Sequence, residues 1–318
     1  MAALKKRKAV KSPSPSSSEG EEEEEAVNGI EGASGSEELD SDISTDSEDE
    51  LNTSSDSEHS SQPSQEVVNV DFEYFDPKPD DFHGIKALLR TYLDDEVWDI
   101  SAFTDLVLAQ TTVGTVVKAG EDDSPIGLLT ALNLGRYQKS SCMTEVHKYL
   151  RVKSAHKAES ALLEDFWDKQ ANETALLISE RLINVPLELA PPLYQGLFEE
   201  VMWATEDEPT QELRDSFKIK NYLYLTKVFE EVLKDNKGEN KEQSKTQSEG
   251  SEITGELIYI KPEDEILHQL SSWSFSFPVT GESTAARQTK GLQQLRLVMA
   301  VEAKHIDKFQ TQLKNLVE

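Results

Sequence analysis

Cysteine is almost absent from this sequence: Cys142 is the single thiol among 318 residues. One thiol cannot form an internal disulfide or a thiolate metal cage, and so few thiols fit a reducing compartment. Long apolar runs are also missing, since none approaches the roughly 20 residues that a membrane span needs. Basic residues near the N-terminus are not followed by the apolar segment of a secretory signal. We therefore expect neither disulfides nor a membrane partner.

Basic residues are scarce relative to acidic ones. The chain has 32 Lys and Arg against 61 Asp and Glu, a formal net charge of −29. Both parts of the chain are acidic, because residues 1–66 hold 5 basic and 18 acidic residues and the remainder holds 27 and 43. Such a chain repels phosphate backbones and attracts basic proteins at long range. The charge excludes direct nucleic-acid binding as the default function and favours a basic protein partner.

Residues 1–66 have the composition of a disordered acidic tail rich in serine. Large apolar side chains are almost missing from residues 12–66, so burial cannot offset the entropy of ordering. A basic cluster precedes this stretch, at Lys5, Lys6, Arg7 and Lys8, and it is either a nuclear import signal or a solvated run of charge. Several hydroxyls are followed three residues later by an acid, which is the pattern of an acidophilic kinase. These phosphorylation candidates are Ser16, Ser18, Ser34, Thr45, Ser47, Thr53 and Ser55.

The segment from Thr174 to Val201 organises the predicted fold. Residues 175–178 are apolar without alternation, which indicates a strand buried on both faces. Pro186 ends the extended stretch, and a proline pair at 191–192 suits the first turn of a helix. Apolar residues then recur every four positions through Val201. A strand, a connector and an amphipathic helix form the unit from which sheets covered by helices are built.

The remainder of residues 67–318 alternates between strand and helix patterns, which predicts one α/β domain with a mixed sheet flanked by helices. Strands are expected near 68–74, 113–118, 126–132, 219–229, 273–279 and 295–301. Helices are expected near 82–92, 101–108, 143–150 and 306–316, and a further helix is expected to extend through 166–167. Residues 205–217 are polar, with no element assigned to them. Residues 235–252 contain no apolar side chain, which indicates a flexible insertion. About eight strands and seven or eight helices are expected in total.

Enzyme signatures are weak throughout the chain. The loop after the predicted strand 126–132 contains one glycine, Gly135, which cannot form a phosphate cradle. Ser179 lacks the flanking glycines of a nucleophile elbow and fits a cap at a strand end. His147 and His156 are nine residues apart without further ligands, which argues against zinc. Cys142 begins a predicted helix, where a thiol pKa can fall, but no histidine pairs with it in the sequence, so an incidental thiol is favoured.

Several segments stand out together: VNVDFEYFDP at 68–77, DDFHGIKALL at 80–89, GTVVK at 114–118, ALNL at 131–134, and LLISERLINVP at 176–186 followed by PPLYQGL. Together these segments resemble the BCCIP family, which comprises nuclear proteins named for binding a breast-cancer-associated recombination mediator and a cyclin-dependent-kinase inhibitor, with a fungal branch called Bcp. The resemblance covers essentially all of 67–318, and SER-x-INVP at 179–186 is its most specific piece. Within the family, the sequence resembles a plant or other non-animal member.

The resemblance implies a fold similar to the GCN5-related acetyltransferases but without the acetyl-CoA pyrophosphate loop. It implies no enzyme activity and no cofactor, a nuclear location with shuttling to the cytoplasm left open, and escort of a basic large-subunit ribosomal protein. Roles in DNA repair and cell-cycle control, with the two partners of the family name, are implied as well. Arg181, Asn184 and Val185 in the connector are the predicted partner-binding residues, although Glu180 and Arg181 could instead form a buried pair. Two alternatives are a degenerate acyl-CoA-binding acetyltransferase and a histone-type acidic chaperone that acts through its tail.

Overall fold

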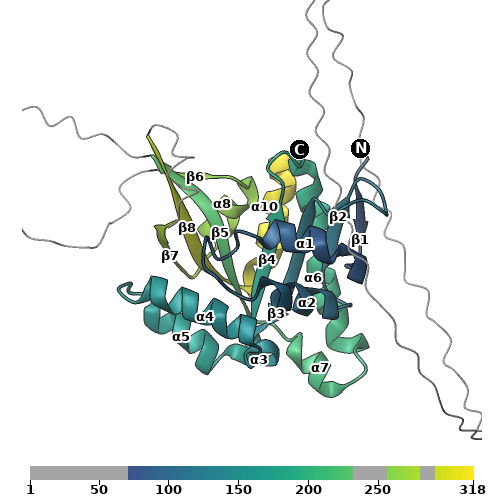
Figure 1. Cartoon of the computed structure of the whole chain (residues 1–318), viewed down its shortest axis with the longest axis horizontal. Helices are drawn as coiled ribbons and strands as arrows, with labels where there is room; N and C mark the ends of the chain where they lie inside the picture. Colours follow the sequence, from purple (N-terminus) through teal and green to yellow (C-terminus); the bar gives the residue numbers. More distant parts are fainter. Residues whose placement is uncertain (1–70, 232–255, 280–290) are drawn as a thin grey trace, which may run out of the picture. The chain divides into compact units, whose positions relative to one another are not determined.

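The computed structural model describes residues 71–231, 256–279 and 291–318 (Figure 1). The acidic tail at 1–66, its import cluster, the seven phosphorylation candidates and the insertion at 235–252 lie outside the described residues, and these predictions stay predictions. Within the described ranges, no helix is both long and apolar enough to span a lipid bilayer.

One eight-stranded sheet runs through the described residues. Its strands are β1 (Glu73–Phe75), β2 (Thr115–Lys118), β3 (Gly127–Asn133), β4 (Thr174–Arg181), β5 (Asn221–Glu231), β6 (Leu257–Tyr259), β7 (Trp273–Pro278) and β8 (Leu292–Glu302). Their spatial order is β1-β2-β3-β4-β5-β8-β7, with β6 alongside part of β5. Every pair is antiparallel except β4 with β5, which run parallel. The predicted mixed sheet is confirmed.

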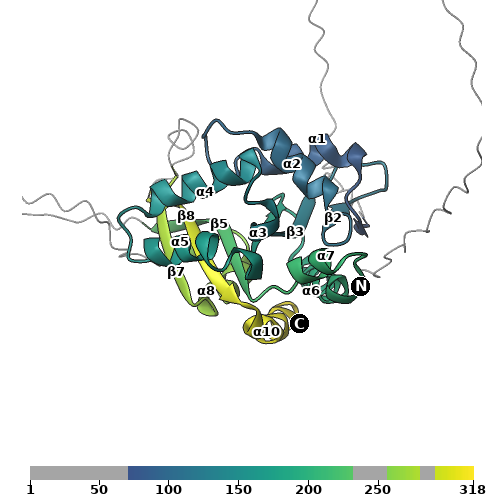
Figure 2. The same ribbon diagram turned by 90° about the horizontal axis from the view of Figure 1, so that it is seen from below.

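Helices cover both faces of this sheet, as predicted. They are α1 (Phe82–Leu89), α2 (Ile100–Ala109), α3 (Leu134–Tyr137), α4 (Ser141–Ser154), α5 (Ser160–Asp168), α6 (Ala190–Asp207), α7 (Gln211–Ser216), α8 (Pro262–Gln269) and α10 (Ile306–Val317). Figure 2 shows α1, α2 and α4 on one side of the sheet and α6 and α10 on the other. The interior accordingly divides into two apolar clusters, one on each face.

The strand β4 contributes to both clusters, which confirms that it is buried on two faces. Ala175 and Leu177 pack under α6, whereas Leu176 and Ile178 pack under the helices of the opposite face. The alternation in β8 divides in the same way: Leu297 and Met299 face α6 and α10, and Val298 faces the other cluster. Side chains in a strand point alternately to opposite faces, so a continuous apolar run needs cover on both.

Four elements were not predicted, and one of them is the four-residue helix α3 in the segment expected to be a loop after β3. The polar stretch 205–217 contains the last turn of α6 and all of α7, which Thr210 caps by accepting a bond from the Leu213 amide. The strand β6 is only three residues long, and α8 begins at Pro262 with three acidic residues in its first turn. The sequence rule that charged residues face solvent fails for α8, because Glu263 and Asp264 are fully buried.

Candidate functional site

The parallel strands β4 and β5 separate toward their carboxyl ends. They pair from Thr174 with Asn221 to Leu177 with Tyr224, and beyond this point β5 pairs instead with β6. We call the space between residues 179–181 of β4 and 225–227 of β5 the wedge. In open α/β sheets, ligands bind in the crevice outside the carboxyl ends of parallel strands. The wedge is therefore the first place to look for a site.

On the α6 side, the first turn of α8 fills the wedge with charged groups. Lys261 Nζ lies 2.6 Å from both the Ser179 carbonyl oxygen and Tyr224 Oη. Asp264 accepts bonds from Tyr224 Oη at 2.9 Å and from Thr226 Oγ1 at 2.6 Å. Lys261 Nζ also lies 3.7 Å from the Asp264 carboxylate. This arrangement compensates buried charge with hydrogen bonds from both strands.

Arg181 completes this cluster from the end of β4. Its guanidinium makes two contacts with the Glu263 carboxylate, one of them 2.9 Å from Nη2 to Oε2 and the other from Nη1 to Oε1. The Arg181 side chain is 10% exposed and that of Glu263 is 0% exposed. Of the two earlier alternatives for Arg181, a buried pair or a partner contact, the structure shows a buried pair, and its partner is Glu263 rather than Glu180.

Burial shifts the pKa values of the acidic groups in the wedge. It raises the pKa of the Asp264 carboxyl from 3.8 to about 6, against the opposing influence of the nearby Lys261 ammonium. The Tyr224 and Tyr194 hydroxyls have pKa values raised well above 10.0, chiefly by burial and then by the neighbouring carboxylates. Both phenols therefore stay protonated across the physiological range, and the Tyr224 hydroxyl donates a hydrogen bond to Asp264.

A second charged cluster lies on the opposite face, around the fully buried Arg296 of β8. Arg296 Nε donates to Asp94 Oδ1 at 2.6 Å, and its Nη2 donates to the Thr91 carbonyl oxygen. Tyr149 Oη donates to the other Asp94 oxygen at 2.6 Å. Asp94 has a backbone φ of 58°, which is unfavourable for a residue with a side chain, and these bonds hold it there.

Lys227 borders this second cluster, and its Nζ donates a hydrogen bond to Thr91 Oγ1. Burial is the main cause that lowers its pKa to about 8, and the nearby Arg296 guanidinium adds to the effect. A lysine with such a pKa exchanges its proton near neutral pH, which is a property of many reactive lysines. Here the ammonium is engaged by a hydroxyl next to Arg296 and Asp94, so its role in this arrangement is structural. The wedge is thus bordered by the chain's own charged side chains on both faces.

The connector from β4 to α6 carries the other predicted partner-binding residues. Asn184 is exposed, whereas Val185 is half-buried against the core and donates its amide to the Leu182 carbonyl at 3.2 Å. Between them and β4 lie two exposed apolar side chains, Leu182 at 49% and Ile183 at 86%. Sequence reasoning missed this pair, although two apolar residues in a short connector after a strand are the signal that could have identified it.

A second connection in the fold could be compared with a phosphate-binding loop. Such a loop was sought after β3, but β3 is antiparallel to β4, and three helices, α3 to α5, connect the two. The helix that follows the parallel strand is α6, so the equivalent loop is 182–189, LINVPLEL, which also lacks glycine. Gly135 has a packing role instead, because a Cβ there would lie 2.0 Å from Asn172 Oδ1. Strand direction, which the sequence does not reveal, is what distinguishes these two connections.

Cys142 and His147, two of the remaining candidate side chains, are held in structural contacts. Cys142 is fully buried in the first turn of α4, where burial raises the pKa of its thiol. His147 stacks on Trp167 with ring centroids 4.5 Å apart and lies 3.1 Å from the Glu164 carboxylate. His156 has no such contact in the described part of the chain, and no cluster of metal-ligating residues occurs among the described residues.

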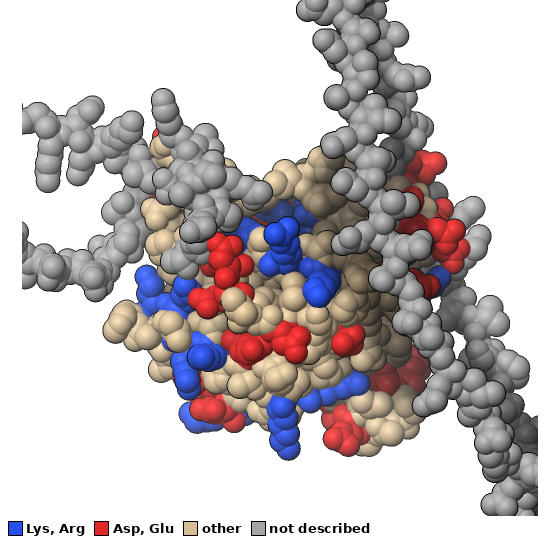
Figure 3. Space-filling model, viewed as in Figure 1, with Lys and Arg blue, Asp and Glu red and all other residues tan. Residues whose placement is uncertain are grey.

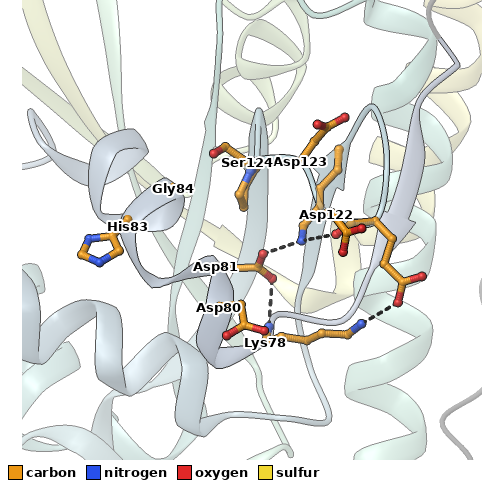
Figure 4. A pocket seen from close by; sticks show the side chains of 11 residues that line it. Lys78, Asp80, Asp81, His83, Gly84, Asp122, Asp123 and Ser124 are labelled. Atoms are coloured by element: carbon orange, nitrogen blue, oxygen red, sulfur yellow. Dashed lines mark hydrogen bonds and ion pairs between the residues drawn. The ribbon is translucent and has the colours of Figure 1, made fainter.

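A pocket of about 190 Å³ lies between the start of α1 and the β2–β3 loop (Figure 4). Its carboxylates are partly neutralised by lysines of the same chain. Lys118 Nζ lies 2.5 Å from the Asp81 carboxylate in a pair that is 5% and 2% exposed. Lys78 Nζ contacts Glu121 at 2.9 Å on the surface. Figure 4 shows Lys78 and Asp81 among the side chains that line the pocket, and its dashed lines mark their interactions.

Comparison with known proteins identifies the family. A family model described as BCCIP matches residues 67–267. A protein of Arabidopsis thaliana named "Protein BCCIP homolog" is 46% identical over 273 residues, which cover 85% of this chain and 80% of that protein. This chain belongs to the BCCIP family. "Protein bcp1" of Aspergillus oryzae is 36% identical over 66% of this chain and 71% of its own length.

A solved structure has the same fold. The crystal structure of BCP1 from Saccharomyces cerevisiae aligns with a TM-score of 0.54 over 81% of this chain and 93% of its own, at 22% identity, which shows the shared fold. The relatives named above carry the family name and no enzyme name. The wedge and the connector are therefore features of a BCCIP-family fold whose partners have to be argued from its surface.

Proposed function

We propose that this BCCIP-family protein is a non-enzymatic nuclear adaptor and chaperone that binds a basic large-subunit ribosomal protein and escorts it during ribosome biogenesis. Shuttling between nucleus and cytoplasm fits such an escort. The family resemblance extends the proposal to partners in DNA repair and cell-cycle control. In this proposal the folded domain recognises the client, and the acidic tail accelerates the encounter and keeps RNA away from it.

The observation that supports this proposal is the charge of the folded part. The described residues contain 21 Lys and Arg against 37 Asp and Glu. Four of those cations, Lys118, Arg181, Lys261 and Arg296, are buried or nearly buried beside carboxylates. Figure 3 shows acidic side chains gathered beside β1 and β2 and over α7. An acidic surface attracts basic proteins before any specific contact forms.

The test uses the full-length protein immobilised on beads and total protein extracted from purified large ribosomal subunits. Bound proteins are washed at about 0.15 M and then about 0.5 M salt, because salt screens long-range attraction more than close contacts. Mass spectrometry identifies what remains. We expect one or a few basic ribosomal proteins to survive the second wash. If no ribosomal protein is retained, the proposal is wrong.

Deleting residues 1–66 separates the folded-domain mechanism from a chaperone that acts through its tail. If the folded domain recognises the client, the deletion slows association and leaves most of the salt-resistant binding. A protein that acts through its tail alone would lose all binding. The acetyltransferase alternative requires binding of an acyl-CoA, and isothermal titration calorimetry of the full-length protein with acetyl-CoA tests it. Heat of binding there would revive the enzyme interpretation.

A further inference from the structure

Helix α6 exposes two adjacent large apolar side chains. Met202 is 58% exposed and Trp203 is 50% exposed, whereas Val201 and Ala204 on either side are buried in the core. The packing of α6 against the sheet is therefore complete without them. Exposed tryptophan and methionine are enriched where proteins contact partners, because both offer large apolar area and tryptophan also attracts cations to its ring face.

A glycine on the same face of α6 borders open space, where a side chain would meet no other atom. Gly196 lies seven residues, or two helical turns, before Trp203, so the two share one side of the helix. A Cβ at Gly196 would meet no atom within 4 Å, whereas a Cβ at Gly84 would collide with Pro125 at 2.4 Å. Glycine within a helix lowers stability relative to alanine. Because residue 196 is a glycine, the helix surface there is flat, and another chain can approach it closely.

The carboxylates at the end of α6 also work against the stability of the helix. Glu206 and Asp207 lie in its last turn, which contains no basic residue. The C-terminal end of a helix carries partial negative charge, so acidic side chains there are repelled. Among the described residues, no Lys or Arg forms an ion pair with Glu206 or Asp207. A cation supplied from outside the chain would relieve this repulsion.

We propose that the α6 outer face, defined as Gly196, Glu199, Met202, Trp203, Glu206 and Asp207, docks a segment of a partner protein rich in lysine and arginine. The partner's cations meet the three carboxylates and the ring of Trp203, and its backbone passes close to the helix at Gly196. This inference rests on the proposed function, since it locates the binding of a basic client. Figure 2 shows α6 beside α7 and α10, on the side of the sheet away from α1 and α4.

The experiment repeats the capture of large-subunit proteins with the full-length protein carrying W203A or E206Q/D207N. Retention of the basic proteins, quantified by mass spectrometry, should fall by about tenfold or more in each, as expected for loss of a central aromatic anchor or a paired charge. The loop Asp95, Glu96 and Val97 supplies matched controls, because it presents two adjacent carboxylates and a fully exposed apolar residue elsewhere. Retention by D95N/E96Q and by V97S should stay within about twofold of the unsubstituted protein.

Gly196→Ala gives a second, independent readout. The added methyl should raise the midpoint of thermal unfolding and at the same time weaken retention by about tenfold, because it fills the space left for the partner backbone. Equal retention by all variants and controls would overturn the assignment to α6 and leave the proposed function standing. No retention by the unsubstituted protein would overturn the proposed function, and this inference with it.

Discussion

Arg181 at the end of β4 and Glu263 in the first turn of α8 form a two-contact ion pair although 82 residues separate them in the chain. The pair joins a strand of the sheet to the helix that fills the wedge. Because the Glu263 side chain is fully buried, its charge depends on Arg181 for compensation. This dependence makes the pair a sensitive point of the fold.

Removing one partner of this pair should destabilise the protein strongly. We expect R181M to lower the free energy of unfolding by about 3–5 kcal/mol, because it leaves a buried carboxylate without a counter-charge. The double variant R181M/E263M should recover most of that loss, since no charge remains uncompensated. Urea denaturation measures all three proteins. A loss below about 1 kcal/mol in R181M would show that the pair behaves like an exposed one.

Asp264 should make stability depend on pH. Its pKa is raised to about 6 in the folded protein, so the folded state binds this proton more tightly than the unfolded chain does. Its stabilising contribution is therefore full below about pH 4 and is lost as the pH rises through about 6. The stability of the natural protein relative to D264N should fall by up to about 3 kcal/mol between pH 4 and pH 8. A difference that stays constant or grows with pH would contradict this assignment.

Gly84→Ala should destabilise the protein even though alanine favours helices. The new Cβ would lie 2.4 Å from Pro125 Cδ, so α1 has to move away from the β2–β3 loop. We expect a loss of about 1–3 kcal/mol in the free energy of unfolding. Gly196→Ala is the control, because the same substitution in open space should stabilise by up to about 1 kcal/mol. Chemical denaturation measures the free energy of unfolding of both variants. Equal changes in that free energy would contradict the prediction.

Cys142 should be almost inert in the folded protein. The thiol is fully buried and burial raises its pKa, so little thiolate forms and reagents cannot reach it. Labelling with a thiol reagent at pH 8 should be slower than in denaturant by a factor of about 1,000 or more, since it requires local opening. Because this is the only cysteine, the rate reports on one site. Rapid labelling under native conditions would show that α4 does not protect it.

Much of the fold was predictable because burial leaves a periodic trace in the sequence. The run at 175–178 and the alternation at 295–301 identified β4 and β8 correctly, together with the faces they present. The closing helix was also predicted, and Ile306, Phe309 and Leu313 are buried as expected, although Leu316 is 46% exposed. Local patterns of this kind follow from the geometry of one element.

The wedge could not be predicted, because its chemistry depends on residues brought together from distant segments. Glu263 and Asp264 look like solvent-facing charges in a polar stretch, and only their contacts with β4 and β5 explain their burial. Arg296 meets Asp94 across 202 residues in the same way. The sequence left Arg181 open between a buried pair and a partner contact, and it could not reveal that Glu263 is the residue with which it pairs. Pairing partners and strand direction leave no periodic trace.

The position of β8 has a consequence for how the protein is made. β8 is the last described strand in the chain, yet it lies inside the sheet, paired with β5 from Asn221 to Glu231 and with β7 on its other side. Until this strand has been synthesised, the edge of β5 that pairs with β8 stays uncovered along all eleven residues of β5. The sheet therefore closes only after β8 has been synthesised, so a chain truncated before β8 loses an interior strand and leaves edges open to aggregation.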